Sequence, residues 1–337
     1  MTESKAISPK RQIGATGISV TPLGLGGAAL GGLFTAVEDA TADETIQAAL
    51  AAGIRFLDTA PFYGYGLSEH RMGRAIRLFG RDKVVLSTKV GRLLRRRVSP
   101  REPDDAWREP LPFEVEYDYS YDGVLRSVED SMHRLGTDRI DILLKHDIGR
   151  DTHGDEAHPA LMSTAMSGGA RAMQRLKEEG IVGAIGLGVN EWQVCAEALE
   201  HHDWDVFLLA GRYTLLEQEV LDGFFPLCDR RGTSIIIGGP FNSGILAGSD
   251  TYNYFKSPQH IQDRVAAIAK ICDSHGASMK AAALQFVLRH PLVASVIPGA
   301  RSRAEFDENL ALMDVALPDG LWSDLKSAGL LHPDAPT

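Results

Sequence analysis

The sequence predicts an α/β protein folded as one closed (β/α)8 barrel, also called a TIM barrel. Eight short apolar runs, rich in β-branched residues, alternate with amphipathic segments along the 337 residues. Such strict alternation predicts a parallel sheet covered by helices, and eight units suit the length of one barrel. No linker or change in composition divides the chain, so we expect a single domain over residues 1–337.

The repeating units can be placed along the chain in order. The expected strands span residues 21–26, 55–59, 84–90, 140–144, 182–189, 206–210, 234–237 and 294–297. The expected helices span residues 42–52, 68–78, 121–135, 169–179, 192–199, 220–230, 261–275, 279–289 and 304–312. The helix over residues 121–135 has the clearest pattern, because its apolar residues recur at helical spacing and Gly136 follows as a stop.

Three segments lie outside these units. Residues 11–20 alternate around a glycine-containing turn, which predicts a β-hairpin that caps the bottom of the barrel. Residues 91–120 and residues 147–168 are expected to be long loops. Because each of them follows a strand, both loops should lie on the face of the barrel that carries the active site.

The composition excludes several classes of protein. The formal net charge is −10 and no long block carries one sign, which disfavours nucleic acid as a partner. Cys195, Cys228 and Cys272 are far apart, so they are expected to be buried thiols in a reducing compartment. The N-terminus shows no signal-peptide core, and no apolar run approaches the roughly 18–20 residues that span a bilayer. We therefore expect a cytoplasmic protein without membrane attachment.

Four titratable residues follow three successive strands of the predicted barrel. Asp58 lies near the end of the second strand and Tyr63 follows it, Lys89 lies near the end of the third and His146 follows the fourth. Barrel enzymes assemble their active sites from such strand ends, so the four side chains are expected to meet. Taken alone, each residue could have a purely structural role. Asp58 could cap a strand end, Lys89 could form an ion pair and His146 could be a hydrogen-bonded polar group of the core.

Together the four residues suit proton transfer. A free tyrosine has a pKa of about 10, which is too high for ready proton exchange at neutral pH. A nearby lysine ammonium favours the phenolate, and a histidine can hydrogen-bond the same substrate oxygen. An aspartate paired with the lysine keeps it charged and in place. The set therefore predicts proton transfer to or from a substrate oxygen.

Asp58, Tyr63, Lys89 and His146 resemble the catalytic tetrad of the aldo-keto reductases. Residues 53–60 and residues 127–141 also match two signatures of that family, and the resemblance extends over roughly residues 10–315. It implies a TIM barrel that transfers hydride between NAD(P) and a small carbonyl or alcohol substrate. It further implies that Tyr63 is the acid/base, that Lys89 and Asp58 lower its pKa, and that His146 orients the carbonyl.

The resemblance also implies two sites for the cofactor at later strand ends. Asn190, after the fifth barrel strand, would bind the nicotinamide carboxamide, although an asparagine there also suits a helix N-cap. A glycine-rich turn after the seventh strand would clasp the pyrophosphate, because its backbone can approach a phosphate closely. This turn comprises Gly239, Pro240, Phe241, Asn242 and Gly244. The tyrosine and glutamine with which many relatives hold the nicotinamide ring are absent, which leaves Phe241, Tyr213 or Trp192 to replace them.

The segment after the eighth strand is expected to bind the adenosine half of the cofactor. Gly299 and Glu305 occupy positions at which NADP-selective relatives have a lysine and an arginine. A carboxylate repels the 2′-phosphate of NADP but accepts from a ribose hydroxyl, so NAD is slightly favoured over NADP. Arg301 lies close by, and its positive charge would favour NADP. Glu308 and Asn309 match residues that contact adenine.

Within the family, residues 119–123, 211–216 and 239–246 resemble the branch of pyridoxal 4-dehydrogenase and the aldose 1-dehydrogenases that act on L-fucose or L-galactose. This implies oxidation of an alcohol or a lactol, with the aromatic loop over residues 107–121 stacked on a pyridine ring or a sugar face. The alternatives are a general reductase of bulkier aldehydes and ketones, or a cofactor-sensing subunit with little turnover. We expect no metal site, because the histidines and carboxylates of residues 147–158 share no face of a strand or helix.

Overall fold

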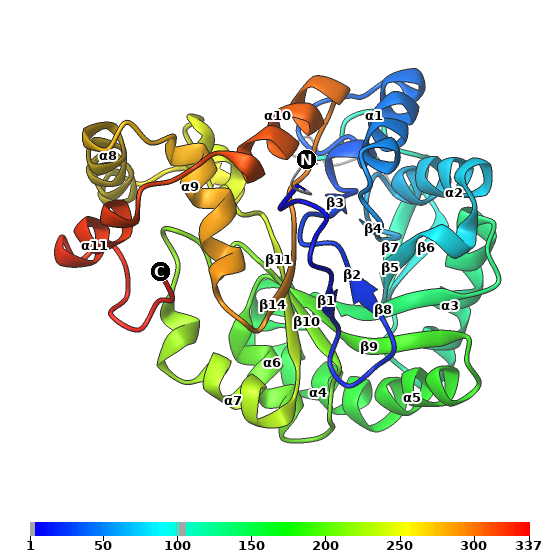
Figure 1. The fold of residues 1–337 in the computed structure, drawn as a ribbon. Helices are drawn as coiled ribbons and strands as arrows, with labels where there is room; N and C mark the ends of the chain where they lie inside the picture. The colour runs from blue at the N-terminus through cyan, green and yellow to red at the C-terminus, as the bar shows by residue number, and fades with distance from the viewer. Residues whose placement is uncertain (1–3, 99, 101–105) are drawn as a thin grey trace.

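The computed structural model describes residues 4–98, 100 and 106–337, and its centre is a parallel sheet of eight strands (Figure 1). In chain order these strands are β3 (Leu25–Gly26), β4 (Phe56–Asp58), β5 (Val85–Val90), β8 (Ile140–His146), β9 (Val182–Val189), β10 (Val206–Ala210), β11 (Ser234–Gly238) and β14 (Val293–Ile297). Each strand pairs with the next, and bridges from Leu23 to Val296 and from Gly26 to Gly299 join the first strand to the last. The sheet therefore closes, and the predicted barrel is confirmed.

Helices surround the sheet at the predicted places, with ends that shift by a few residues (Figure 1). They are α1 (Asp39–Ala51), α2 (Leu67–Phe79), α3 (Tyr121–Leu135), α5 (Ala170–Glu178), α6 (Trp192–Leu199), α7 (Phe224–Arg231), α8 (Gln259–Ser274), α9 (Met279–Phe286) and α10 (Arg303–Asp314). Helix α3 begins where the hydroxyl of Ser120 accepts from the Gly123 N–H, and it ends at Gly136 with a φ of 63°. Among the described helices, none is long and apolar enough to cross a membrane.

The N-terminal hairpin closes one end of the barrel. Strands β1 (Arg11–Gln12) and β2 (Ser19–Val20) pair antiparallel, as predicted. Ile13 and Val20 are fully buried in the cluster that fills the barrel interior. Arg11 donates to the carbonyl of Val293, at the start of β14, which fixes the hairpin at the N-terminal ends of the strands. The opposite, C-terminal end is thereby left for the active site.

The prediction of a loop over residues 147–168 is wrong. Helix α4 (Arg150–Thr164) and a π-helical turn η3 (Ala165–Gly169) occupy most of this segment. The pattern concealed the helix because it is kinked at Gly154, which has a φ of 73°, and contains Pro159. The carboxylate of Glu191 accepts from the backbone N–H groups of Arg150 and Asp151, so a distant residue stabilises the start of this helix.

Further elements were not expected from the sequence. The predicted loop over residues 91–120 contains an antiparallel pair, β6 (Arg92–Arg96) and β7 (Phe113–Tyr117). A small hairpin follows β11 and consists of β12 (Thr251–Tyr252) and β13 (Phe255–Lys256). Its turn residues Asn253 and Tyr254 both have positive φ, and no glycine marks the turn in the sequence. Near the C-terminus, α11 (Asp319–Ser327) covers the outer layer.

Short helical turns complete the description. They are η1 (Ala29–Gly31), η2 (Arg81–Lys83), η4 (Glu219–Asp222), η5 (Asn242–Ala247) and η6 (Val287–Arg289). The segment η5 lies in the glycine-rich turn after β11. It contains consecutive positive φ angles at Asn242, Ser243 and Gly244, so the backbone turns sharply there.

Candidate active site

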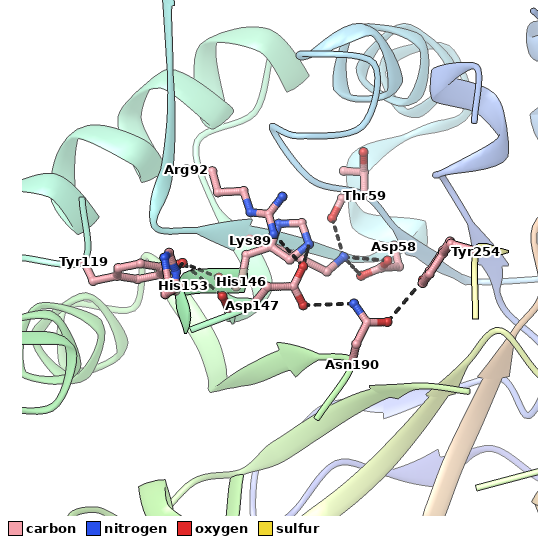
Figure 2. A network of polar contacts seen from close by, with 10 residues as sticks. All are labelled: Asp58, Thr59, Lys89, Arg92, Tyr119, His146, Asp147, His153, Asn190 and Tyr254. Carbon is pink, nitrogen blue, oxygen red and sulfur yellow. Dashed lines mark hydrogen bonds and ion pairs between the residues drawn. The ribbon is translucent and has the colours of Figure 1, made fainter. Parts of the chain in front are cut away.

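A buried ion pair joins the ends of β4 and β5. The ammonium of Lys89 donates to Asp58 Oδ1 at 3.0 Å and Oδ2 at 2.8 Å, and to the carbonyl of Thr59 at 2.9 Å (Figure 2). The two side chains are only 1% and 2% exposed. Asp58 pairs in register with Ser87, and Lys89 lies two residues further along the same face of β5. Since the Ser87 hydroxyl also donates to Asp58, the pair is held rigidly.

Tyr63 lies against this ion pair. The Lys89 ammonium is 4.6 Å from the centre of the tyrosine ring. Burial raises the pKa of Tyr63 above its usual value, whereas the charge of Lys89 and its hydrogen bond to the phenol act in the opposite direction. The charge of Asp58 also raises this pKa, so the prediction that Asp58 lowers it directly is wrong; Asp58 acts only by holding Lys89. Burial alone would lower the pKa of Lys89, but the charge of Asp58 raises it above the usual value. Lys89 therefore stays charged, and its position favours the phenolate of Tyr63.

His146 completes the group at the end of β8. Its ring centre is 5.8 Å from that of Tyr63 in an edge-to-face arrangement. Burial, together with the charges of Arg92 and Lys89, lowers the pKa of His146 well below its usual value. The imidazole is therefore neutral at neutral pH, and it can donate one hydrogen bond without carrying charge. The structure thus brings together all four predicted catalytic residues.

A second ion pair beside the histidine was missed in the sequence. The guanidinium of Arg92 lies 2.6 Å from Asp147 Oδ2, and both side chains are largely buried (Figure 2). Arg92 also stacks 4.1 Å above the centre of the Phe62 ring. The His-Asp sequence at a strand end was the available signal, but Asp147 was counted among the residues of a metal-like cluster.

The members of that cluster have other partners. His153 Nε2 lies 3.0 Å from the hydroxyl of Tyr119, and His158 lies between the carbonyl of Ile148 and the carboxylate of Glu197. Within the described ranges, no group of three or more histidine, cysteine or acidic side chains is arranged to hold a metal ion.

Three of the four predicted catalytic residues, Tyr63, Lys89 and His146, line a cavity of about 580 Å³. Its walls combine aromatic and aliphatic side chains with several charged and polar groups. The lining includes Phe62, Tyr63, Tyr65, Trp107, Lys89, His146, Asp147 and Asn190. An apolar cavity with a few convergent polar groups is typical of a small-molecule site.

Asn190 lies at the boundary of this cavity, at the end of β9. Its side-chain amide donates to Asp147 Oδ1 at 3.3 Å and accepts from the hydroxyl of Tyr254 at 3.2 Å (Figure 2). Arg212 donates to the backbone carbonyl of Asn190. The amide is therefore oriented by neighbours on two sides, and it can present the donor and the acceptor that a carboxamide requires.

A groove of about 820 Å³ continues from the cavity, and we call it the cofactor groove. Seven of the predicted cofactor residues line it, namely Phe241, Gly244, Gly299, Arg301, Glu305, Glu308 and Asn309. Leu33 and Tyr254 line both the cavity and the groove, so the two spaces adjoin. Lys280 was missed in the sequence, yet it lines the groove and lies 2.6 Å from Glu308.

Three predicted residues of the glycine-rich turn have a different place. Among the described residues that line the groove, Gly239, Pro240 and Asn242 do not appear. The side chain of Asn242 is 1% exposed, donates to the carbonyl of Gly211 and accepts from the hydroxyl of Thr214. It therefore ties the turn after β11 to the loop after β10, which fixes the backbone beside the groove.

The three aromatic candidates for holding the nicotinamide ring lie in different parts of the structure. Tyr213 is fully buried, with its ring centre 5.0 Å from that of Phe225, and Trp192 packs against Phe224. Phe241 lines the cofactor groove. Tyr254, which the sequence did not single out, is the aromatic residue at the junction between groove and cavity.

A parallel barrel with an ion-paired lysine, a tyrosine and a neutral histidine around one cavity defines a proton-transferring barrel enzyme. The model of the Aldo/keto reductase family matches residues 22–329 of the chain. The chain belongs to the aldo-keto reductase family, and it is an NAD(P)-dependent oxidoreductase that interconverts carbonyl and alcohol groups.

Two curated relatives match nearly the whole chain. Pyridoxal 4-dehydrogenase of Microbacterium luteolum is 44% identical over 96% of this chain and 98% of its own length. D-threo-aldose 1-dehydrogenase of a Pseudomonas species is 38% identical over 94% of this chain and 96% of its own length. Both belong to the branch that the sequence motifs resemble, so that prediction is confirmed.

Solved structures share the fold. The holo form of an aldo-keto reductase of Bacillus halodurans superimposes with a TM-score of 0.73 at 24% identity, covering 97% of this chain and 99% of that chain. A glycerol dehydrogenase of Gluconobacter oxydans has a TM-score of 0.72 at 22% identity, covering 97% and 98%. At this identity the likeness shows the common barrel.

Proposed function

We propose that the chain oxidises the cyclic hemiacetal of pyridoxal or of an aldose to a lactone, as a single-domain NAD(P)-dependent dehydrogenase. The names of the two relatives refer to pyridoxal and to an aldose. Pyridoxal carries a hydroxymethyl group beside its aldehyde, and both compounds close to a ring in water. The observation that carries the proposal is the aromatic wall of the cavity, in which Trp107 contacts both Phe62 and Tyr63, because a flat or hydroxylated ring can pack against such a wall.

In this proposal Tyr63 takes the proton of the hemiacetal hydroxyl at its phenolic oxygen. Lys89 stabilises the phenolate by its charge, and Asp58 holds Lys89 in place. The neutral imidazole of His146 donates to the substrate oxygen and orients it toward Tyr63. A bound NAD(P) would supply the hydride acceptor for the carbon that bears this oxygen, and the hydride donor in the direction of reduction.

The groove suits an elongated cofactor. Lys280 and Arg301 line it, each paired with a glutamate of the same groove, and the turn over Asn242–Gly244 brings backbone close to the same space. Asn190 would hold the carboxamide of the nicotinamide, while Glu308 and Asn309 would lie beside the adenine. Gly239 and Pro240 would support the turn from behind. Buried free cysteines and the acidic surface agree with a cytoplasmic enzyme that acts on small molecules, which we also propose.

NAD remains the favoured cofactor. Glu305 lies in the first turn of α10 and accepts from Arg301 Nε at 2.9 Å, so the arginine is already paired. Burial would raise the pKa of Glu305, but hydrogen bonds from Arg301 bring it below the usual value, and the carboxylate stays charged. A 2′-phosphate would have to displace Glu305 from Arg301.

Replacing Glu305 with glutamine is expected to shift the cofactor preference toward NADPH by roughly tenfold, because one negative charge near the 2′-phosphate is removed. The measurement is the Kd of NADH and of NADPH, determined by fluorescence titration without substrate. Asp307→Asn is the matched control. Asp307 pairs with Arg303 on the same helix, and it is not among the described residues that line the groove. Tighter binding of NADPH than of NADH by the unchanged protein would contradict the preference.

The proposed function is tested by the absorbance of the reduced cofactor with pyridoxal, L-fucose, L-galactose and simple aldehydes. Lactone formation from pyridoxal or from an aldose, at higher kcat/KM than for any simple aldehyde reduction, is the expected result. Efficient reduction of bulky aldehydes or ketones alone would identify a general reductase instead. Tight cofactor binding without turnover of any substrate would identify a cofactor-sensing subunit.

A further inference from the structure

Asp147 is a carboxylate inside the substrate cavity that the tetrad mechanism does not use. It follows His146 directly and lines the same cavity, next to Asn190. Its side chain is 12% exposed, and its Oδ2 lies 3.4 Å from Nε2 of His146. Any substrate oxygen held by His146 would therefore bring its neighbouring substituent within reach of Asp147.

The backbone conformation and the burial of Asp147 both lower the stability of the folded state. Its φ is 40°, in the left-handed region that residues other than glycine seldom adopt. Its partner Arg92 is also buried, and a buried ion pair loses much of its attraction to the cost of removing both charges from water. Strained backbone and a buried charge at a cavity wall are typical of a functional site.

The carboxylate retains capacity for a further hydrogen bond. Two carboxylate oxygens offer about four acceptor sites. Arg92 occupies one site of Oδ2 at 2.6 Å, the side-chain amide of Asn190 occupies one site of Oδ1 at 3.3 Å, and the backbone N–H of Asn190 also donates to the carboxylate. The cavity is lined largely by apolar and aromatic residues, so a hydroxyl group of a substrate in that space is a suitable donor for the remaining site.

We propose that Asp147 binds a hydroxyl group beside the reacting carbon and thereby selects substrates that carry one. The substrate class is then an aldehyde or hemiacetal with a neighbouring hydroxyl that is protonated at neutral pH, such as the hydroxyl next to the anomeric carbon of an aldose. Arg92 is a positioning residue, because its guanidinium holds Asp147 Oδ2 (Figure 2). Burial raises the pKa of Asp147, and the charge of Arg92 opposes that rise. The inference rests on the proposed function.

The test compares substrates that differ by one hydroxyl. The first pair is 2-hydroxybenzaldehyde and benzaldehyde, in reduction with NADH; the second is D-glucose and its 2-deoxy analogue, in oxidation with NAD. The kcat/KM of the unchanged protein should favour the hydroxylated member by roughly 10-fold to 100-fold, the range of a hydrogen bond to a charged group. In Asp147→Asn this ratio should fall toward one, mainly through a larger rise in KM for the hydroxylated member than for the compound without the hydroxyl.

Two further measurements separate this role from a structural one. The Kd of NADH should be unchanged in Asp147→Asn, because an effect through Asn190 would weaken cofactor binding as well. Asp141→Asn is the matched control, since Asp141 forms an ion pair with Arg81 near the start of the same strand, far along β8 from His146. It should leave the substrate ratio unchanged even if the thermal midpoint falls.

The outcomes distinguish the inference from the proposed function. Turnover of both members of a pair at equal kcat/KM by the unchanged protein would overturn the role of Asp147 and leave the oxidoreductase intact. An equal loss for both members in Asp147→Asn would show that Asp147 only orients His146. Calorimetric titration of the cofactor-loaded protein gives the same comparison without turnover: tighter binding of the hydroxylated aldehyde supports the inference even if neither compound reacts, and equal binding overturns it.

Discussion

Replacing Tyr63 with phenylalanine is expected to lower kcat by roughly 10²-fold to 10⁴-fold, the usual contribution of a positioned acid/base. The phenolic oxygen is the group that exchanges the proton with the substrate, and phenylalanine keeps the ring that Lys89 and Trp107 contact. The measurement is kcat in both directions with the best substrate, together with the Kd of NADH. Cofactor binding and the thermal midpoint should remain near those of the unchanged protein.

A suitable control for this variant is Tyr121→Phe. Tyr121 lies at the start of α3, where its hydroxyl accepts from Arg175 on the outer surface. Removing that hydroxyl should leave kcat unchanged. Tyr63→Phe with kcat within a factor of about three of the unchanged protein would contradict the assignment of Tyr63 as the acid/base.

Replacing Lys89 with methionine is expected to reduce both activity and stability. Asp58 would remain as a buried carboxylate without its cation, which costs roughly 3–5 kcal/mol. The pKa of Tyr63 would rise further, because the charge of Lys89 is the main influence that opposes burial. Oxidation needs the phenolate, so its kcat/KM should begin to rise only at higher pH than in the unchanged protein.

The double variant Asp58→Asn with Lys89→Met separates the two effects. Removing both charges should restore most of the free energy of unfolding, because no unpaired buried charge remains. Activity should not recover, since Tyr63 still lacks its neighbouring cation. Denaturant unfolding and the pH profile of oxidation are the two measurements. Recovery of activity along with stability would show that Lys89 acts only by maintaining the fold.

Most of the barrel could be predicted from the sequence, because its strands and helices are short, regular and bounded by clear signals. The strands over residues 182–189 and 206–210 and the helices over residues 121–135 and 192–199 have the predicted ends. Helix α4 could not be predicted, since its kink at Gly154 interrupts the apolar period and its N-terminus is stabilised by Glu191, a contact between distant parts of the chain. Local patterns contain no information about such a contact.

The meeting of the four candidate catalytic side chains could also be predicted, because they lie at or shortly after strand ends and parallel strands bring their ends together. The residues that contact and orient the side chains of the site could not be predicted. Arg92 reaches Asp147 from β6, in a segment that was expected to be a loop, and Tyr254 reaches Asn190 from a hairpin whose turn contains no glycine. The three aromatic candidates for holding the nicotinamide were chosen by their position in the sequence, and only packing shows that Tyr213 is buried elsewhere.

The bridge between Gly26 and Gly299 has a consequence for how this protein is made. A ribosome releases the N-terminal strand long before residue 299, so the growing barrel has two unpaired sheet edges during most of its synthesis. The groove forms only when this last seam closes, because Gly299 and the start of α10 take their places beside the first strand at that moment. Pairing between segments so distant in the sequence forms slowly. A cofactor that binds only the closed barrel stabilises the barrel after the first and last strands have paired.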